Sequence, residues 1–139
     1  MYKLSKRSIG RLAGVNPLLI AIIVDSIKDS PYDFGIPQYG GVSTPEDQNY
    51  LYLKGVSQLD GYVKESYHQS GNAFDIYGYV NGKATWDKDI LEDIAKHIIK
   101  IAKERYKVTL TWGGDWNNNN IRVDKDPNES FFDGAHFQI

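Results

Sequence analysis

Histidine and aspartate occur together in two short segments of the chain. The segment SYHQSGNAFD, from Ser66 to Asp75, places His68 seven residues before Asp75, with Gly71 between them. The closing segment DGAHFQI places Asp133 three residues before His136. Two histidines and one carboxylate are a known ligand set for zinc, and they leave a fourth position open for water. The residue types therefore suit a catalytic metal site with Asp133 as a proton acceptor.

The spacing decides how such a site could form. Seven residues of helix rise about 10 Å, too far for two ligands that each lie about 2 Å from zinc. A turn at Gly71 would instead let a loop histidine and a strand aspartate converge. The third ligand must come from His97 or His136, and His97 falls within a predicted helix, where a plain helix residue is the alternative interpretation.

A structural interpretation of the same residues is equally simple. His68 and Asp75 could form a hydrogen-bonded turn, and His136 could be a capped residue at a sheet edge. The chain has no cysteine, so disulfides, thiolate ligands and cysteine nucleophiles are excluded. Any transition metal must be held by nitrogen and oxygen.

Composition predicts one globular domain over residues 1–139. The net charge of -2 and the lack of basic runs argue against nucleic-acid binding. The apolar run PLLIAIIV is too short to span a bilayer, and no signal peptide is recognisable, so we expect a protein made in the cytoplasm, without a membrane anchor and monomeric. The ten tyrosines and three tryptophans fill a core or line a groove for a polar polymer.

Helices are predicted mainly in the first half. Ser5 to Ala13 forms a short helix, and Asn16 caps a second one that starts at Pro17 and ends near Ser30. YDFGI reads as a strand. Thr44-Pro45 starts a third helix that Gly55 ends.

Strands are predicted mainly in the second half. AFDIYGYV and KATW form a hairpin around Asn81-Gly82, since both turn residues accept positive φ. An apolar stripe predicts a helix from about Asp87 to Tyr106. VTLTW is a strand, residues 113–130 form a long polar loop, and AHFQI closes the chain as a strand. The order predicts an α+β domain with N-terminal helices packed on a mostly antiparallel sheet.

Three motifs carry a family resemblance. SYHQSGNAFDI resembles the S-x-H-x-x-G-x-A-x-D motif of the VanY-like zinc D,D- and L,D-peptidases, and WGGDW and DGAHFQ resemble two further segments of that family in the same order. PYDFGI, YVNGKATW and the length are most similar to the phage endolysin branch, the L-alanyl-D-glutamate peptidases. The resemblance covers roughly residues 30–139 and implies the small VanY-like (hedgehog-like) α+β fold.

The resemblance also implies roles for single residues. It implies His68, Asp75 and His136 as zinc ligands and Asp133 as the catalytic base. Ser66 matches a residue that steadies the site. Two tryptophans are candidates for the walls of the substrate groove, or else core residues: Trp112 and Trp116.

One departure from the family pattern concerns a cation. GVSTPEDQNYLYLKG, from Gly41 to Gly55, matches a family segment and places Gln48 at its glutamine, but Ser43 stands where the family has an arginine. By resemblance, that arginine holds the substrate and stabilises the oxyanion. Losing one oxyanion donor typically raises the activation barrier by about 3–4 kcal/mol. The expectation is that another cation replaces it, that activity is reduced, or that the domain no longer cleaves. The candidate cations are Lys54, Lys64 and Arg122.

The sequence thus predicts a zinc-dependent peptidoglycan peptidase. By resemblance its substrate is the stem peptide of peptidoglycan, cut between L-Ala and D-Glu, and its setting is phage-induced lysis of the host, with release from the host cytoplasm to the cell wall. The alternatives are a weakened or inactive zinc-containing module that binds the wall, and a D,D-carboxypeptidase.

The polar loop suggests a second cation. Asp115, Asn117, Asn119 and Asp126 occupy positions 1, 3, 5 and 12 of a twelve-residue window, which resembles an EF-hand calcium loop. Asn120 replaces the usual glycine at position 6. Calcium here could order the loop and position Asp133; the alternative is a solvated polar loop.

Overall fold

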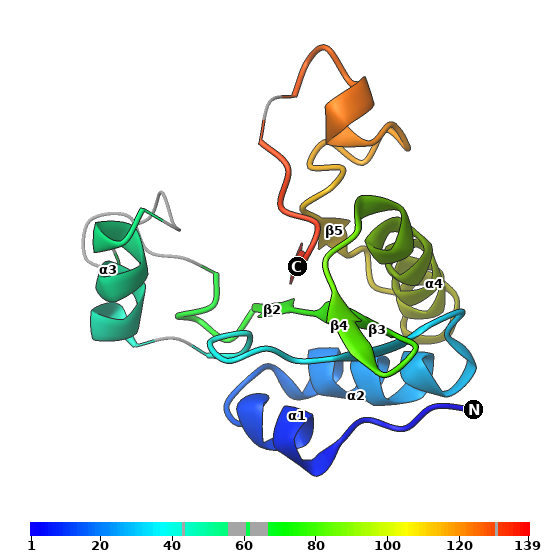
Figure 1. Cartoon of the computed structure of the whole chain (residues 1–139), viewed down its shortest axis with the longest axis horizontal. Helices are drawn as coiled ribbons and strands as arrows, with labels where there is room; N and C mark the ends of the chain where they lie inside the picture. The colour runs from blue at the N-terminus through cyan, green and yellow to red at the C-terminus, as the bar shows by residue number, and fades with distance from the viewer. Residues whose placement is uncertain (43, 56–60, 62–66, 130) are drawn as a thin grey trace.

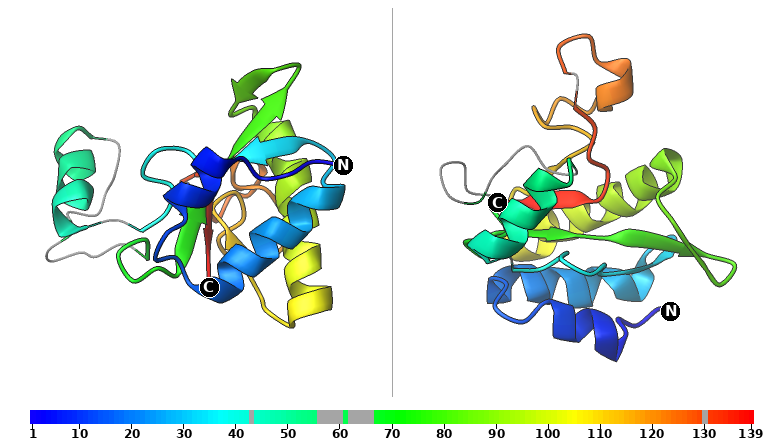
Figure 2. Two further views of the ribbon diagram at one scale, coloured as in Figure 1. Left: turned by 90° about the horizontal axis from the view of Figure 1, so that it is seen from below. Right: turned by 60° about the vertical axis from the view of Figure 1, so that its left-hand side comes forward.

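The computed structural model describes residues 1–42, 44–55, 61, 67–129 and 131–139. Two short helices and one 3-10 turn come first: α1 (Lys6–Arg11), α2 (Pro17–Ser26) and η1 (Ile27–Asp29). The predicted Asn16 cap is confirmed, because its side chain accepts from Leu18 N, and the first helix is capped by Ser5, whose side chain accepts from Ser8 N. Figures 1 and 2 show α1 and α2 along one side of the strands.

The long helix α4 (Lys88–Tyr106) supplies much of the core. It starts where predicted, with the Asp87 side chain accepting from two main-chain N–H groups of the first turn. It packs on α2, and apolar side chains of both helices are buried: Leu19, Ile22, Ile23, Leu91, Ile94, Ile98. The described helices include none that is both long and apolar enough to cross a membrane.

Two antiparallel sheets replace the single sheet predicted. One has the order β1-β3-β4, from β1 (Asp33–Gly35), β3 (Tyr77–Val80) and β4 (Lys83–Thr85). The other has the order β2-β6-β5, from β2 (Ala73–Asp75), β6 (His136–Gln138) and β5 (Thr111–Trp112). The β3–β4 turn has positive φ at Asn81 (53°) and Gly82 (76°), as predicted.

The structure corrects two strand predictions. The run AFDIYGYV divides at Ile76, whose N–H donates to Ala135 O, whereas Tyr77 pairs with Gly35 of the other sheet. The run VTLTW keeps only Thr111 and Trp112 as a strand. Val108 N is engaged at the end of α4, where it donates to Ala102 O.

Successive side chains of this divided segment point to opposite faces, so core residues lie on one face and a candidate site residue lies on the other. Phe74, Ile76 and Gly78 are buried, and Phe74 stacks on Phe137 of β6 with ring centroids 4.9 Å apart. Asp75 and Tyr77 alternate with these residues and therefore belong to the opposite face of the segment. A metal-ligand candidate and an aromatic residue thus share that face.

Helix α3 (Pro45–Leu53) lies apart from α4, on the other side of the strands (Figure 1). Thr44 and Asp47 form the capping box at its start, and Gly55 follows its end with φ of 79°. Both boundaries agree with the sequence prediction.

The segment that joins β1 to α3 is tied to α1. Ile36 N donates to the buried Ser8 Oγ over 2.9 Å, and Arg11 Nη1 donates to Ile36 O over 2.9 Å. A Cβ on Gly41 would collide with the Arg11 carbonyl group. Helix α1 therefore sets the position of residues 36–41, which reach the site described below.

We expect Ser8→Ala to lower the free energy of unfolding by about 1–3 kcal/mol, because the buried N–H of Ile36 loses its acceptor. Gly10→Ala on the same helix is the matched control. Its added Cβ meets nothing within 4 Å, so it should be neutral or raise stability by about 0.5–1 kcal/mol. Urea denaturation of the metal-free protein measures both, and a Ser8→Ala variant as stable as the wild type contradicts this account of residue 36.

Candidate metal centre

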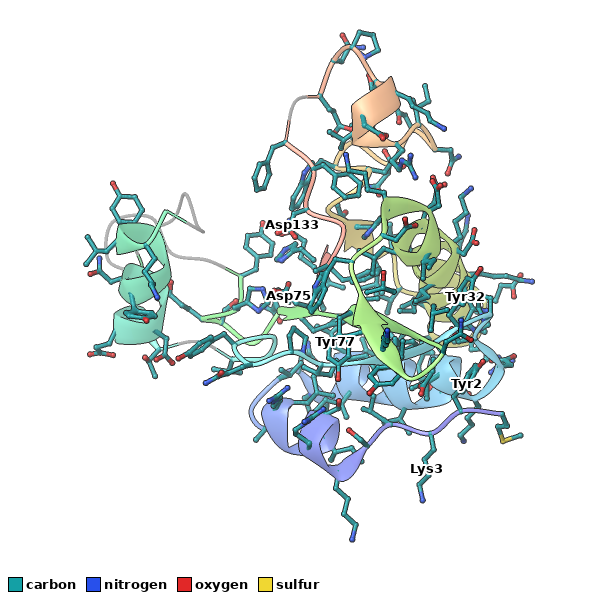
Figure 3. All side chains as sticks on the ribbon, viewed as in Figure 1. Tyr2, Lys3, Tyr32, Asp75, Tyr77 and Asp133 are labelled. Carbon is teal, nitrogen blue, oxygen red and sulfur yellow. The ribbon has the colours of Figure 1, made fainter. Side chains whose placement is uncertain are left out.

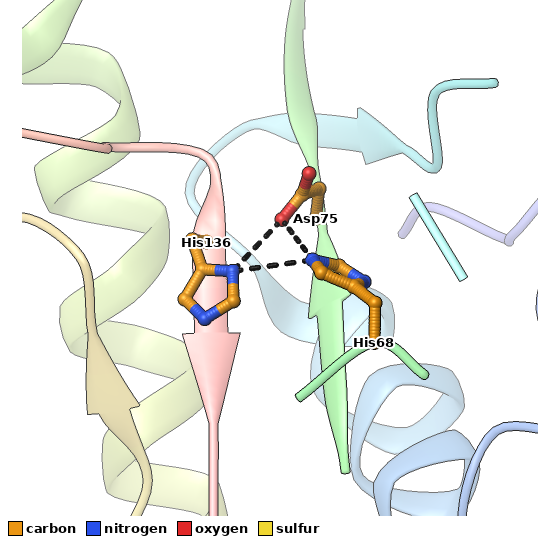
Figure 4. A group of neighbouring side chains, drawn as sticks. All are labelled: His68, Asp75 and His136. Atoms are coloured by element: carbon orange, nitrogen blue, oxygen red, sulfur yellow. Dashed lines mark hydrogen bonds and ion pairs between the residues drawn. The ribbon is translucent and has the colours of Figure 1, made fainter. Parts of the chain in front are cut away.

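Three predicted ligands come together from separate elements. Asp75 ends β2 and lies directly opposite His136, the first residue of β6. Their N–H groups donate elsewhere, to Gly40 O and Asp133 O, so they form a non-hydrogen-bonded pair, in which side chains lie closest. His68 reaches them from the turn that precedes β2 (Figure 4).

The ligand atoms have the spacing of a tetrahedral metal site. His68 Nε2 lies 3.1 Å from Asp75 Oδ1 and 3.2 Å from His136 Nδ1, and the latter two atoms are 3.3 Å apart. Ligands at about 2.0–2.1 Å from zinc in tetrahedral geometry are about 3.3 Å from one another. Both histidines are buried, with 8% of their surface exposed. The group can hold a metal ion.

The outer nitrogens of the two rings are already engaged. His68 Nδ1 lies 2.9 Å from Gly41 O, and His136 Nε2 lies 2.8 Å from Gln138 Oε1. Since both partners are acceptors, each of these nitrogens carries the hydrogen, and the neutral rings turn their lone pairs toward Asp75. Three electron-rich atoms converging on one point require a cation between them, so the residues present fit a metal ion.

Without a metal, a proton bound to a histidine would supply the positive charge that these three atoms require. Burial lowers the pKa of His68, but the hydrogen bond and charge of Asp75 outweigh it, so the pKa lies above its ordinary value. Burial raises the pKa of Asp75, yet hydrogen bonds with His136 and His68 hold it at about 2. The carboxylate is therefore ionised near neutral pH and ready to bind a cation.

Asp133 lies close enough to this group for the charges of Asp75, His136 and His68 to act on its carboxyl group, and it is labelled next to Asp75 in Figure 3. The turn that carries it is held by hydrogen bonds from Asp133 N to Gly113 O and from His136 N to Asp133 O, and a Cβ on Gly113 would collide with the Asp133 carbonyl group. Burial, and then the charge of Asp75, raise the pKa of Asp133 above its ordinary value. A carboxylate so placed is a stronger base than an exposed one.

The two tryptophans have different surroundings. Trp116 is tilted against the His136 ring at 5.4 Å between centroids and stacks on Phe131 at 6.3 Å, so it borders the metal centre. Trp112 is buried, and its Nε1 donates to Gly134 O over 2.8 Å. The groove hypothesis thus keeps support for Trp116, whereas Trp112 belongs to the core.

The other histidine and the candidate cations lie elsewhere or are engaged. His97 Nε2 contacts Ser26 O at 2.8 Å and Asp29 Oδ1 at 3.1 Å, which links α4 to the end of α2. Lys54 donates to Tyr50 Oη over 2.9 Å. Ser43, Lys64 and Ser66 lie outside the described residues, as does the side chain of Gln48.

Arg122 is buried and bound by carboxylates. Its Nε donates to Asp124 over 2.7 Å, its Nη1 donates to Asp89 over 2.6 Å, and Nη1 lies 3.7 Å from Glu92. These contacts join the polar loop to α4. Because these carboxylates occupy the guanidinium group, the structure does not support Arg122 as the cation that replaces the family's arginine.

Sequence reasoning missed the groups that orient the histidines. Gln138 follows His136 by two residues and therefore shares its face of β6, a signal that was available. The carbonyl of Gly41 carried no signal, because its contact with His68 depends on how residues 36–41 pack against α1.

Comparisons with known proteins agree with this architecture. A family model described as phage L-alanyl-D-glutamate peptidase matches residues 1–139. The L-alanyl-D-glutamate peptidase of Escherichia phage T5 is 32% identical over 139 residues, which covers 99% of this chain and 98% of that protein. The expected resemblance is therefore confirmed.

Solved structures support the fold. The L-Ala D-Glu endopeptidase ChiX of Serratia marcescens matches with a TM-score of 0.76 at 27% identity, over 99% of this chain and 90% of that one. DacB from Streptococcus pneumoniae matches with a TM-score of 0.51 at 21% identity, over 92% of this chain and 67% of that one, which is a likeness of fold. The VanY-like α+β fold predicted from the sequence is confirmed.

The loop predicted to bind calcium is closed by its own hydrogen bonds. Asp115 accepts from Asn119 N and Asn120 N, and the amide groups of Asn117 and Asn119 donate to Asp126 Oδ2 over 3.3 and 2.7 Å. The hydrogen bond from Asn128 N, and then that from Asn119, lower the pKa of Asp126. Calcium would require both amides to rotate and present oxygen.

The calcium site stays a prediction with a direct test. If the loop binds calcium, titration calorimetry of the metal-loaded protein should show heat and saturation at or below millimolar calcium, within the range of EF-hand loops. Asp126→Asn should abolish that heat, because the loop loses a charged ligand, and Asp93→Asn on the exposed face of α4 should not. Absence of heat leaves the segment as a self-closed polar loop.

Proposed function

The chain belongs to the phage L-alanyl-D-glutamate peptidase family, and from this premise we propose that it is a zinc peptidase that cuts the L-Ala–D-Glu bond in the stem peptide of bacterial peptidoglycan. We propose further that its 139 residues act as one domain in phage-induced lysis of the host cell. The observation that carries the proposal is the convergence of three lone pairs beside the half-buried carboxyl group of Asp133.

The protein's contribution starts with the ligand set. His68, Asp75 and His136 are the three residues that would hold zinc, which supplies Lewis-acid activation of water and of the scissile carbonyl group when bound. Gly41 and Gln138 keep both rings in the tautomer that binds a metal. Trp116, packed on His136, limits rotation of that ring.

Asp133 performs the proton transfers in this proposal. Its carboxylate takes a proton from the water that attacks the L-Ala carbonyl carbon. The same proton is then delivered to the nitrogen of D-Glu as the amide bond breaks, so the products are a free carboxylate and a free amine. The turn locked against Gly113 holds Asp133 in place for both steps.

Reduced activity is the alternative that one observation favours. Ser43 stands at the position of the family's arginine, and Arg122 is engaged by Asp89, Glu92 and Asp124. A purely structural metal site, however, has no need of a half-buried carboxyl group with a raised pKa next to its ligands. Asp133 therefore favours an enzyme over an inactive wall-binding module.

We expect one zinc ion per chain, measured by elemental analysis after dialysis. His68→Ala should lose tight binding, because two protein ligands remain. Gln138→Leu should weaken binding about 10–100-fold, since His136 loses the acceptor that orients it. His97→Ala is the control and should keep full zinc content, because its contacts lie at Ser26 and Asp29. Full zinc in His68→Ala would refute the ligand assignment.

Asp133→Asn should retain zinc and the fold but lower the rate of peptidoglycan cleavage by about 10²–10⁴-fold, because an amide cannot accept the proton. Mass spectrometry of fragments from purified peptidoglycan measures the rate and identifies the bond. Asp93→Asn, an exposed carboxylate on α4, should stay near the wild-type rate. If Asp133→Asn also does so, the base lies elsewhere, and Asp115 is the next carboxylate to replace.

A further inference from the structure

Three aromatic side chains form a surface that the proposed chemistry does not use. Tyr77 and Tyr79 lie on β3, and Trp86 follows β4 directly. Tyr79 is 38% exposed and Trp86 is 57% exposed, whereas Tyr77 is buried between them. The Tyr77 ring centroid lies 6.1 Å from that of Tyr79 and 5.7 Å from that of Trp86. We call these three residues the aromatic platform.

Contacts with β1 and α1 hold the Tyr77 ring of the platform in place. A Cβ on Gly35 would lie 2.7 Å from Tyr77 Oη, so the Tyr77 ring occupies the space that a larger side chain on β1 would fill. Arg7 of α1 donates to Tyr77 Oη over 3.4 Å. A rigid aromatic surface loses little conformational entropy when it binds a ligand, which favours recognition over simple exposure.

The platform is continuous with the metal centre. Asp75, Tyr77 and Tyr79 alternate with the buried residues Phe74 and Ile76, so they belong to one face of an extended segment. Successive residues on one face of a strand are about 7 Å apart. Figure 3 shows Asp133, Asp75 and Tyr77 in succession through the middle of the molecule. A ligand that extends from the metal centre along this segment reaches the buried Tyr77 after about 7 Å and the exposed rings of Tyr79 and Trp86 beyond it.

The proposed substrate has a sugar at that distance. In peptidoglycan, the L-Ala nitrogen is bonded to the lactyl group of muramic acid. An alanine and a lactyl unit, each about 3.5 Å long when extended, therefore separate the scissile carbonyl from the sugar ring. This span of about 7 Å equals the step from Asp75 to the buried Tyr77, so the sugar that bears the peptide starts at the inner edge of the platform and the glycan strand continues over the exposed rings of Tyr79 and Trp86.

We propose that the aromatic platform binds the glycan strand of peptidoglycan, as a subsite for the amino sugars next to the scissile peptide. The C–H faces of pyranose rings pack on aromatic rings, and the tyrosine hydroxyls and Arg7 offer partners for sugar hydroxyl and acetamido groups. The charged side chains nearby are of both signs, Arg7 and Asp33, which suits an uncharged polymer. This inference rests on the proposed peptidoglycan substrate.

Binding can be measured without catalysis. In ¹H–¹⁵N spectra of the protein, titration with a tetramer of β-1,4-linked N-acetylglucosamine should shift the indole resonance of Trp86 with a Kd of about 1 mM or below. Trp112, whose Nε1 donates to Gly134 O in the core, serves as the internal reference and should not shift. A Trp86 resonance that ignores the sugar, or that responds only to protein concentration because the platform meets a second copy, overturns the inference.

Kinetics test whether the platform serves the reaction. The readout compares kcat/KM for two substrates, a stem peptide linked to its disaccharide and the free peptide that starts with L-Ala–D-Glu. The first value is divided by the second. Trp86→Ala and Tyr79→Ala should each lower this ratio about tenfold, the effect of losing one stacking contact. Trp86→Phe should retain most of it, and Lys83→Ala on the same hairpin should leave it unchanged.

The two proposals fail in distinguishable ways. If the wild type cleaves neither substrate, the proposed function is wrong, and the Trp86 titration still reports whether the platform binds sugar. If the wild type cleaves both substrates and Trp86→Ala leaves the ratio at the wild-type value, the function stands and the glycan subsite is overturned. An exposed aromatic cluster that only stabilises the sheet gives this second result.

Discussion

Asp75 and His136 face each other across the short antiparallel pairing of β2 with β6, and every other part of the metal centre is arranged around that pair. A shift of one residue in the pairing would turn one of these two side chains to the opposite face from the other. The neighbouring pair, Phe74 and Phe137, prevents such a shift, because both rings are fully buried and stack with an interplanar angle of 6°. The hydrophobic core therefore sets the register, and the register sets the distance between two of the three proposed metal ligands.

The third ligand depends on a different part of the chain. His68 is oriented by Gly41 O, and Gly41 lies in a segment that Ser8 and Arg11 tie to α1. Helix α1 contributes no side chain to the metal group, yet it acts on the site through two layers of contacts. This arrangement is typical of metal sites, where the residues that orient the ligands matter almost as much as the ligands themselves.

The sequence was sufficient wherever local chemistry decides structure. Asn16 and Thr44 cap the helices that were predicted from them, an apolar stripe predicted α4, and the family motifs pointed to the group of His68, Asp75 and His136 that the structure brings together. It was insufficient where partners are distant in the chain. Ile76 divides a strand-like run because its two sides pair with different sheets, and Arg122 is occupied by carboxylates of α4 and its own loop. No local pattern encodes either choice, since both depend on which surfaces meet after folding.

The distance between the ligands along the chain has a consequence for folding. His68 and His136 are 68 residues apart, so an ion held between them closes a long loop in a protein that has no disulfide. Such a cross-link removes entropy from the unfolded chain only while the ion is bound. It also stabilises the native state in proportion to the logarithm of the free ion concentration, because the unfolded chain lacks the assembled ligand set. Metal supply in the surrounding medium would then govern how long the molecule survives as well as whether it works.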